Sequence, residues 1–252
     1  MIRRIAAIVI LGACALALFW GMSASRPSIT IENAKAVPVE GRNDMFMVTL
    51  DMVNDGAAST FLGASSPQAQ MLMVMNPGHD GAALVVPGGG KASLAMDGAH
   101  LMLRGGGDDF TQGGFIPLTL SFANGQQVST RVIHAGSTTM DHSGAGVSTS
   151  PAPTLTLIPP AQVDADGFEM RLSTENFAFV RVEDGTPHVP GEGHAHIYLN
   201  GLKLGRLYDT RFDIGALSPG SYDLRVALNS HDHRPYLADG VPVAAQFAFT
   251  FP

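Results

Sequence analysis

Cysteine is almost absent from this chain of 252 residues, which contains 1 Cys against 9 His and 12 Met. The single cysteine, Cys14, lies in an N-terminal apolar stretch, so a chain that has lost this stretch can form neither a disulfide nor a reactive thiolate. Histidine and methionine without cysteine are typical of a metal site in an oxidising compartment, where thiols are lost to disulfides.

Basic residues are also scarce, with 15 Lys and Arg against 22 Asp and Glu and a net charge of −7. A phosphate backbone is bound by clustered cations, so this charge balance excludes a nucleic acid as the expected partner.

Only 15% of the residues are charged, and no helical periodicity extends beyond a turn or two. Instead, short alternating or β-branched runs are separated by turn segments such as Asn54-Asp55-Gly56 and Asn124-Gly125. This spacing predicts an all-β protein built from antiparallel β-sandwiches.

Residues 1–25 have the pattern of a Sec-type signal segment, with Arg3 and Arg4 ahead of an apolar run and small residues at its end. Two other interpretations stand: retention of the run as a membrane anchor, and lipidation at Cys14 within Leu11-Gly12-Ala13-Cys14. All three place the remaining chain in the periplasm or outside the cell, with membrane contact only through an uncleaved leader.

The stretch Asp97-Gly98-Ala99-His100-Leu101-Met102-Leu103 reads as a β-strand that follows a turn. Side chains alternate faces along a strand, so His100 and Met102 share one face, a half-site for a soft metal such as Cu(I). Upstream, Met71, Met73 and Met75 share a face by the same period of two. The alternative is that these methionines fill a core and that His100 is a polar strand end.

Within residues 27–134, several segments together resemble the PCu(A)C family of periplasmic copper chaperones. They are Asn54-Asp55-Gly56, Leu62-Gly63-Ala64-Ser65-Ser66-Pro67, His100-Leu101-Met102-Leu103 and Pro117-Leu118-Thr119-Leu120-Ser121-Phe122. The resemblance implies a cupredoxin-like β-sandwich that holds Cu(I) with two His and two Met.

The later ligand pair of that family falls on His100 and Met102, whereas its earlier His falls near Met73 and its earlier Met near Ala83 or Leu84. The resemblance therefore implies an altered, methionine-richer site. In it, Met73, Met71 or Met75 supplies sulfur and His79 replaces the missing imidazole. The alternative is a family fold whose site has decayed.

Residues 135–153 are expected to be a flexible linker of small polar residues, with Met140-Asp141-His142 in its middle. Residues 154–252 are expected to form the second domain. Here Leu217-Ser218-Pro219-Gly220-Ser221-Tyr222 has the pattern of a tyrosine corner, which is typical of immunoglobulin-like sandwiches.

Five of the nine histidines lie in this second domain, and four of them form the pairs His194/His196 and His231/His233. Imidazoles with a neighbouring carboxylate such as Asp232 suit Cu(II) or Zn(II) better than Cu(I). The alternative is that the pairs are hydrogen-bonded strand structure. The pattern also resembles a bacterial periplasmic domain type with "GEGHAHxYxxG" and a later "LNxxDH", which adds an expectation of metal binding and no defined activity.

Together, these patterns predict a periplasmic copper-binding protein, a chaperone or resistance factor, with copper and a copper-acceptor protein as its partners. The alternatives are a copper-dependent redox enzyme that uses the second-domain histidines, and a metal-free adhesion or scaffold protein. No catalytic residue is expected, because no Ser-His-Asp or P-loop pattern occurs in the sequence.

Overall fold

The computed structural model describes residues 28–107, 110–136, 146–164, 166–183 and 186–251. These residues form strands and turns without any helix, which confirms the prediction of an all-β fold. The expected leader and the Met140-Asp141-His142 segment lie outside the described residues. Among those described, there is no apolar helix of membrane-spanning length.

In its described residues the N-terminal unit consists of nine strands, and alternating burial along most of them places one face of the strand in a core. Its largest fully buried side chains include Leu50, Met52, Leu101 and Phe122. The strands are β1 (Ile29–Val39), β2 (Arg42–Asn54), β3 (Ser59–Ser65), β4 (Ala69–Met75), β5 (Leu84–Val86), β6 (Gly90–Leu94), β7 (His100–Gly105), β8 (Phe115–Phe122) and β9 (Gln127–His134).

The C-terminal unit has its own core, in which Met170, Leu224 and Tyr236 are fully buried. The Tyr222 hydroxyl donates to the Ser218 carbonyl, which forms the tyrosine corner that the sequence predicts. The strands are β10 (Val147–Ser148), β11 (Thr154–Ile158), β12 (Gly167–Glu175), β13 (Ala178–Phe179), β14 (Glu192–Leu199), β15 (Leu202–Leu207), β16 (Arg211–Gly215), β17 (Gly220–Asn229), β18 (Tyr236–Ala238), β19 (Val241–Pro242) and β20 (Ala244–Phe251).

Most strand pairings are antiparallel, as predicted. Three short pairings are parallel in the described part of the chain: β1 with β9, β10 with β18, and β13 with β14. The first of them joins the β2-β1 and β9-β8-β3 segments into one continuous sheet of the N-terminal unit.

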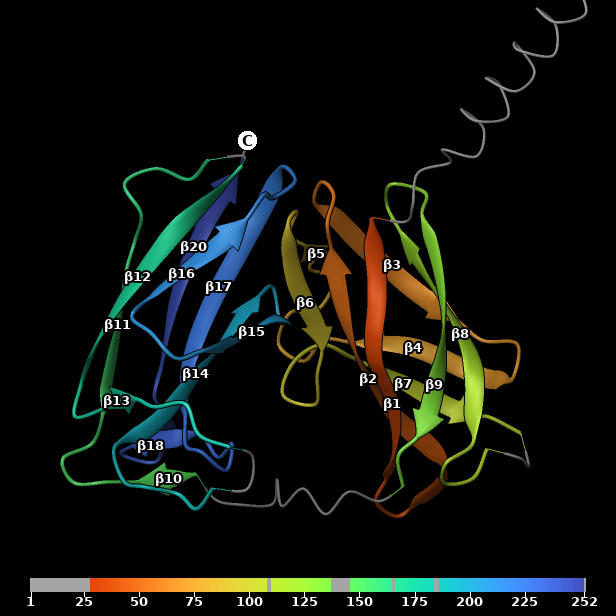
Figure 1. Cartoon of the computed structure of the whole chain (residues 1–252), viewed down its shortest axis with the longest axis horizontal. Helices are drawn as coiled ribbons and strands as arrows, with labels where there is room; N and C mark the ends of the chain where they lie inside the picture. The colour runs from red at the N-terminus through yellow and green to blue at the C-terminus, as the bar shows by residue number, and fades with distance from the viewer. Residues whose placement is uncertain (1–27, 108–109, 137–145, 165, 184–185, 252) are drawn as a thin grey trace, which may run out of the picture.

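The two units lie side by side, and β6 of the first faces β15 of the second (Figure 1). Ser93 and Lys203 are paired at this contact, so one sheet runs through both units. Each unit also contributes a side chain to the core of the other. Val85 of the N-terminal unit packs in the C-terminal core, and Leu202 of the C-terminal unit packs in the N-terminal core. The units are therefore docked through both backbone and apolar contacts.

The β14–β15 hairpin makes much of this contact through its Asn200-Gly201 turn. Both residues have positive φ (51° and 83°), as a type I′ hairpin requires. Asn76 donates through its amide to the Asn200 carbonyl at 2.9 Å, and the Ala99 N–H donates to the Gly201 carbonyl at 2.9 Å. The hairpin therefore lies against the turn that precedes β7.

Replacing Gly201 by alanine should test this contact. A β-carbon there would lie 2.0 Å from the Asn76 side-chain oxygen, in addition to the strain of a φ of +83°. We expect Gly201→Ala to lower the free energy of unfolding by about 2–4 kcal/mol in denaturant titrations. Gly125→Ala is the matched control, because its φ is +82° but nothing lies within 4 Å of its new methyl group. A loss at Gly201 no larger than the loss at Gly125 would contradict the tight contact.

Candidate metal sites

A row of methionines crosses three neighbouring strands of the N-terminal unit, β4, β7 and β2. Met102 on β7 lies opposite Met73 on β4 and, on its other side, opposite Met47 on β2. Directly opposite residues on paired strands share a face, with β-carbons about 4.5–5.5 Å apart. Three thioethers are therefore neighbours across the sheet.

The same face continues to either side of Met102. His100 lies opposite Met75, and Arg104 lies between Met71 and Met45. We call Met45, Met47, Met71, Met73, Met75, His100 and Met102 the Met face. The three methionines of β4 are 36–44% exposed, whereas the alternate residues of β7, Leu101 and Leu103, are fully buried in the core. The Met face is thus on the outer side of the sheet, so these methionines are not fillers of the core.

The strand period predicts one shared face for Met71 and Met73 and another for His100 and Met102, and the pairing of β4 with β7 makes these a single face. Met45 and Met47 were not among the predicted donors. The alternation Met45-Phe46-Met47 marks them as sharing a strand face, but only the pairing of β2 with β7 brings that face beside Met102.

His100 is only 7% exposed, and its Nδ1 lies 2.9 Å from the Gly98 carbonyl oxygen. A carbonyl can only accept, so Nδ1 carries the proton and donates it. The lone pair of His100 is therefore on Nε2, the form of imidazole that binds a metal.

His79 was expected to supply an imidazole to the same site. Its Nε2 instead lies 3.2 Å from Asp223 Oδ2, in a contact between the turn after β4 and strand β17 of the other unit. Its position is therefore explained by docking of the two units.

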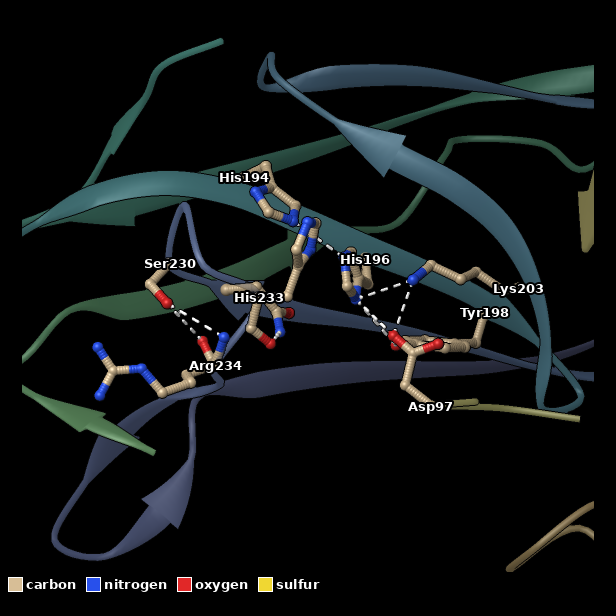
Figure 2. Close-up of polar contacts among 9 residues, drawn as sticks. Asp97, His194, His196, Tyr198, Lys203, Ser230, His233 and Arg234 are labelled. Carbon is tan, nitrogen blue, oxygen red and sulfur yellow. Dashed lines mark hydrogen bonds and ion pairs between the residues drawn. The ribbon is translucent and has the colours of Figure 1, made fainter. Parts of the chain in front are cut away.

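A second group of donors lies in the C-terminal unit at the start of β14. Nitrogen atoms of His194, His196 and His233 all lie within 4.8 Å of one another, and we call these residues the histidine cluster. His194 and His196 share a strand face and are each 2% exposed, and their Nε2 atoms are 2.9 Å apart. Figure 2 shows the three rings gathered at this point.

His231 does not join the cluster, although the sequence pairs it with His233. Residues 230–233 form a turn rather than a strand, with the His233 N–H donating to the Ser230 carbonyl at 3.0 Å and a φ of 66° at His233. The period of two does not apply in a turn, so the two rings diverge. His231 Nε2 lies 3.5 Å from a Glu192 carboxylate oxygen, within ion-pair distance but without hydrogen-bond geometry.

A polar network backs the cluster at His196. Asp97 Oδ2 lies 2.7 Å from His196 Nδ1, 2.7 Å from Lys203 Nζ and 2.8 Å from the Tyr198 hydroxyl (Figure 2). Nδ1 lies nearest to the carboxylate, with Lys203 Nζ at 3.1 Å and the Tyr198 hydroxyl at 3.2 Å from the same nitrogen. With its proton on Nδ1, directed at the carboxylate that can only accept, His196 turns its Nε2 lone pair toward His194. Asp97 belongs to the turn between β6 and β7, so the N-terminal unit supplies this partner. In the sequence Asp97 only begins the stretch 97–103, and no local pattern links it to His196.

Burial is the main reason that the imidazoles of His194 and His196 stay neutral. Burial, with His196 and His233 nearby, lowers the pKa of His194 to about 2. Burial also lowers the pKa of His196 and outweighs the hydrogen bond to Asp97. Burial alone would raise the pKa of Asp97, but His196 and Lys203 hold it well below its usual range. His194 and His196 therefore present neutral imidazoles, the form that coordinates metals.

The cluster geometry approaches what a metal requires. Two imidazole nitrogens on one tetrahedral metal, each at 2.0–2.1 Å, are about 3.3 Å apart. The 2.9 Å separation in the first pair is that of a hydrogen bond between the two Nε2 atoms and is close to this value. Metal binding would displace the shared proton, and His233 needs to approach further. Three nitrogen donors with one open position suit Cu(II) or Zn(II).

Residues 29–133 match the family model described as "Putative lipoprotein LpqE-like". Comparison with curated proteins finds no match. Among solved structures, a copper-bound PCuAC domain from PmoF2 is 19% identical, covering 43% of this chain and 93% of its own, with a TM-score of 0.38. An apo PCuAC domain from PmoF1 is 16% identical, covering 43% and 94%, with a TM-score of 0.39.

A third solved structure, the Cu(I) form of a protein from Deinococcus radiodurans determined in solution, is 22% identical. The match covers 46% of this chain and 83% of that protein, with a TM-score of 0.36. The family match, at residues 29–133, falls on the same segment in which the residues predict a PCu(A)C-like domain. The N-terminal unit of this chain is therefore similar to the LpqE-like lipoprotein family.

Proposed function

We propose that this protein is an exported copper-binding protein that carries Cu(I) on the Met face. The observation that carries the proposal is the alignment of Met73, Met102 and Met47 across three adjacent strands, with His100 two residues along from Met102. Thioethers and one imidazole form a soft donor set, which favours Cu(I) over harder ions.

The function is that of a carrier rather than of an enzyme. The β4 methionines are 36–44% exposed, so a partner's ligands can reach a bound ion and displace them one at a time. Thioethers bear no titrating proton, so pH has little effect on their share of the binding. The natural partner is then a periplasmic copper-acceptor protein.

The histidine cluster adds a second metal site of different chemistry in the C-terminal unit. Its donors are three imidazoles, of which those of His194 and His196 are buried and held neutral, and this set favours Cu(II) or Zn(II). We assign Cu(II) to it. One protein can then hold copper in both oxidation states at separate places.

Competition with a chromophoric Cu(I) chelator under anaerobic conditions tests the Met face in the full chain. The wild-type protein should withdraw Cu(I) from the chelator. His100→Ala and Met102→Ala should each weaken this by more than about 10-fold, because removing a ligand costs at least as much as removing a hydrogen-bonding partner of one.

Met52→Leu is the matched control, because Met52 lies on the core-facing side of β2 and is fully buried. It should leave the Cu(I) affinity unchanged. A wild-type protein that takes no Cu(I), or a His100→Ala variant that binds as tightly as the wild type, would refute the assignment.

A further inference from the structure

We infer that the histidine cluster is a site shared by the two units, in which Asp97 of the N-terminal unit positions His196 of the C-terminal unit for the metal. Filling the cluster then tightens the docking of the units. This inference rests on the proposed binding of a metal ion by His194, His196 and His233.

The position of Asp97 is set by a compact turn. Within it, the Ala95 N–H donates to the Ala99 carbonyl at 2.7 Å, and the Gly98 N–H donates to the Ala95 carbonyl at 3.1 Å. The turn is pressed against the β14–β15 hairpin, since a β-carbon on Gly98 would lie 2.6 Å from the Gly201 carbonyl oxygen. Asp97 thus reaches His196 only when the two units are docked.

The Asp97 carboxylate is also held from the other side. Lys203 donates to Oδ2 at 2.7 Å and the Tyr198 hydroxyl donates at 2.8 Å, and both residues belong to the C-terminal unit. Lys203 sits at the pairing of β15 with β6. The carboxylate is therefore fixed in place and its charge is balanced beside the imidazole.

This arrangement matches the carboxylate–histidine–metal geometry by which proteins orient imidazole ligands. In this inference the Asp97 carboxylate, at 2.7 Å, favours the Nδ1–H tautomer of His196 over the tautomer in which Nδ1 accepts from Lys203 at 3.1 Å. That tautomer aims Nε2 at the cluster, and the carboxylate increases the electron density on this nitrogen. A bound cation withdraws electron density from the ring in return, which makes Nδ1–H a stronger donor to Asp97. Because linkage is reciprocal, metal binding and docking of the units strengthen each other.

The test compares Asp97→Asn with Asp223→Asn in a His100→Ala background, titrated with Cu(II) alone. An asparagine in place of Asp97 keeps the size of the side chain but removes the charge that supports His196. Asp223→Asn weakens another contact between the units, the one to His79 at 3.2 Å, without touching the cluster. We expect Asp97→Asn to weaken Cu(II) binding about 10–100-fold and to shift the Cu(II) electron paramagnetic resonance spectrum. Asp223→Asn should do neither.

Hydrogen exchange supplies a measurement that does not depend on comparing affinities. The Ala99 N–H donates to the Gly201 carbonyl across the two units, so its exchange reports on docking. Adding Cu(II) to the His100→Ala protein should slow this exchange, and it should not do so when Asp97 is replaced by asparagine.

Three results would overturn the inference: equal loss of affinity in both variants, no loss at Asp97, or exchange at Ala99 that is indifferent to Cu(II). Failure of the proposed function looks different. In that case His194→Ala leaves the Cu(II) affinity unchanged, both with aspartate and with asparagine at position 97.

Discussion

Replacing His194 and His196 together by alanine should abolish the higher-affinity Cu(II) binding while leaving Cu(I) binding on the Met face intact. The two rings are each 2% exposed and face each other through Nε2 atoms 2.9 Å apart, so they provide two of the three donors of the cluster. The loss should exceed the 10–100-fold that removal of a ligand's hydrogen-bonding partner typically causes. Isothermal titration with Cu(II), and chelator competition with Cu(I), measure the two affinities separately.

His231→Ala is the matched control for this experiment. It removes another buried histidine from the same unit, only two residues from His233, but His231 lies beside Glu192 and outside the cluster. The affinity for Cu(II) should therefore stay at the wild-type value. A comparable loss at His231 would show that the cluster forms with different ligands when metal is bound.

The metal-free protein should lose stability steeply as the pH falls below about 6.5. His194 has a pKa of about 2 in the folded protein, against 6.5 as its unperturbed value. The unfolded chain therefore binds a proton between these values that the folded chain does not, and acid favours unfolding. His194 alone contributes about 1.4 kcal/mol for each pH unit below 6.5, or about 2–3 kcal/mol between pH 6.5 and 4.5. The lowered pKa of His196 acts in the same direction.

Guanidinium unfolding followed by circular dichroism, with a chelator present, measures this slope. Asp97 does not contribute to the pH dependence between pH 6.5 and 4.5. Its pKa is lowered in the folded protein, so the stability it provides is lost only as the pH falls below its unperturbed pKa of 3.8. His194→Leu carries no titrating group, so its free energy of unfolding should depend less on pH, by about 1.4 kcal/mol per pH unit. The same slope in the variant and the wild type would mean that His194 is not kept neutral by burial.

Much of the fold and part of the candidate sites follow from local patterns. Alternation along 100–103 and 71–75 predicts that His100 and Met102 share a strand face and that the upstream methionines share another. The pairing of β4 with β7 makes these one face. The Asn200-Gly201 pair predicts a hairpin because both positions need positive φ, and the structure has it.

The remaining features depend on contacts between residues far apart in the chain. The alternation of side chains along a strand assigns each residue to a face of its own strand but does not say which strand lies beside it. The sequence therefore does not mark Met45 and Met47 as neighbours of Met102. It also fails where the chain turns, which is why His231 and His233 diverge. The contact of His79 with Asp223 spans 144 residues, beyond the reach of any local pattern.

The amino-acid sequence by itself determined the β-strands, the inward and outward faces of each strand, and the supply of sulfur and imidazole donors, with the single cysteine placed in the N-terminal apolar stretch. These properties depend on neighbouring residues and on residue type alone. Only the tertiary structure decided which donors meet: three methionines across β2, β7 and β4, two histidines of β14 with one from the turn after β17, and Asp97 brought to His196 from the other unit. Strand pairing and docking make these choices, because they bring together side chains that local geometry leaves independent.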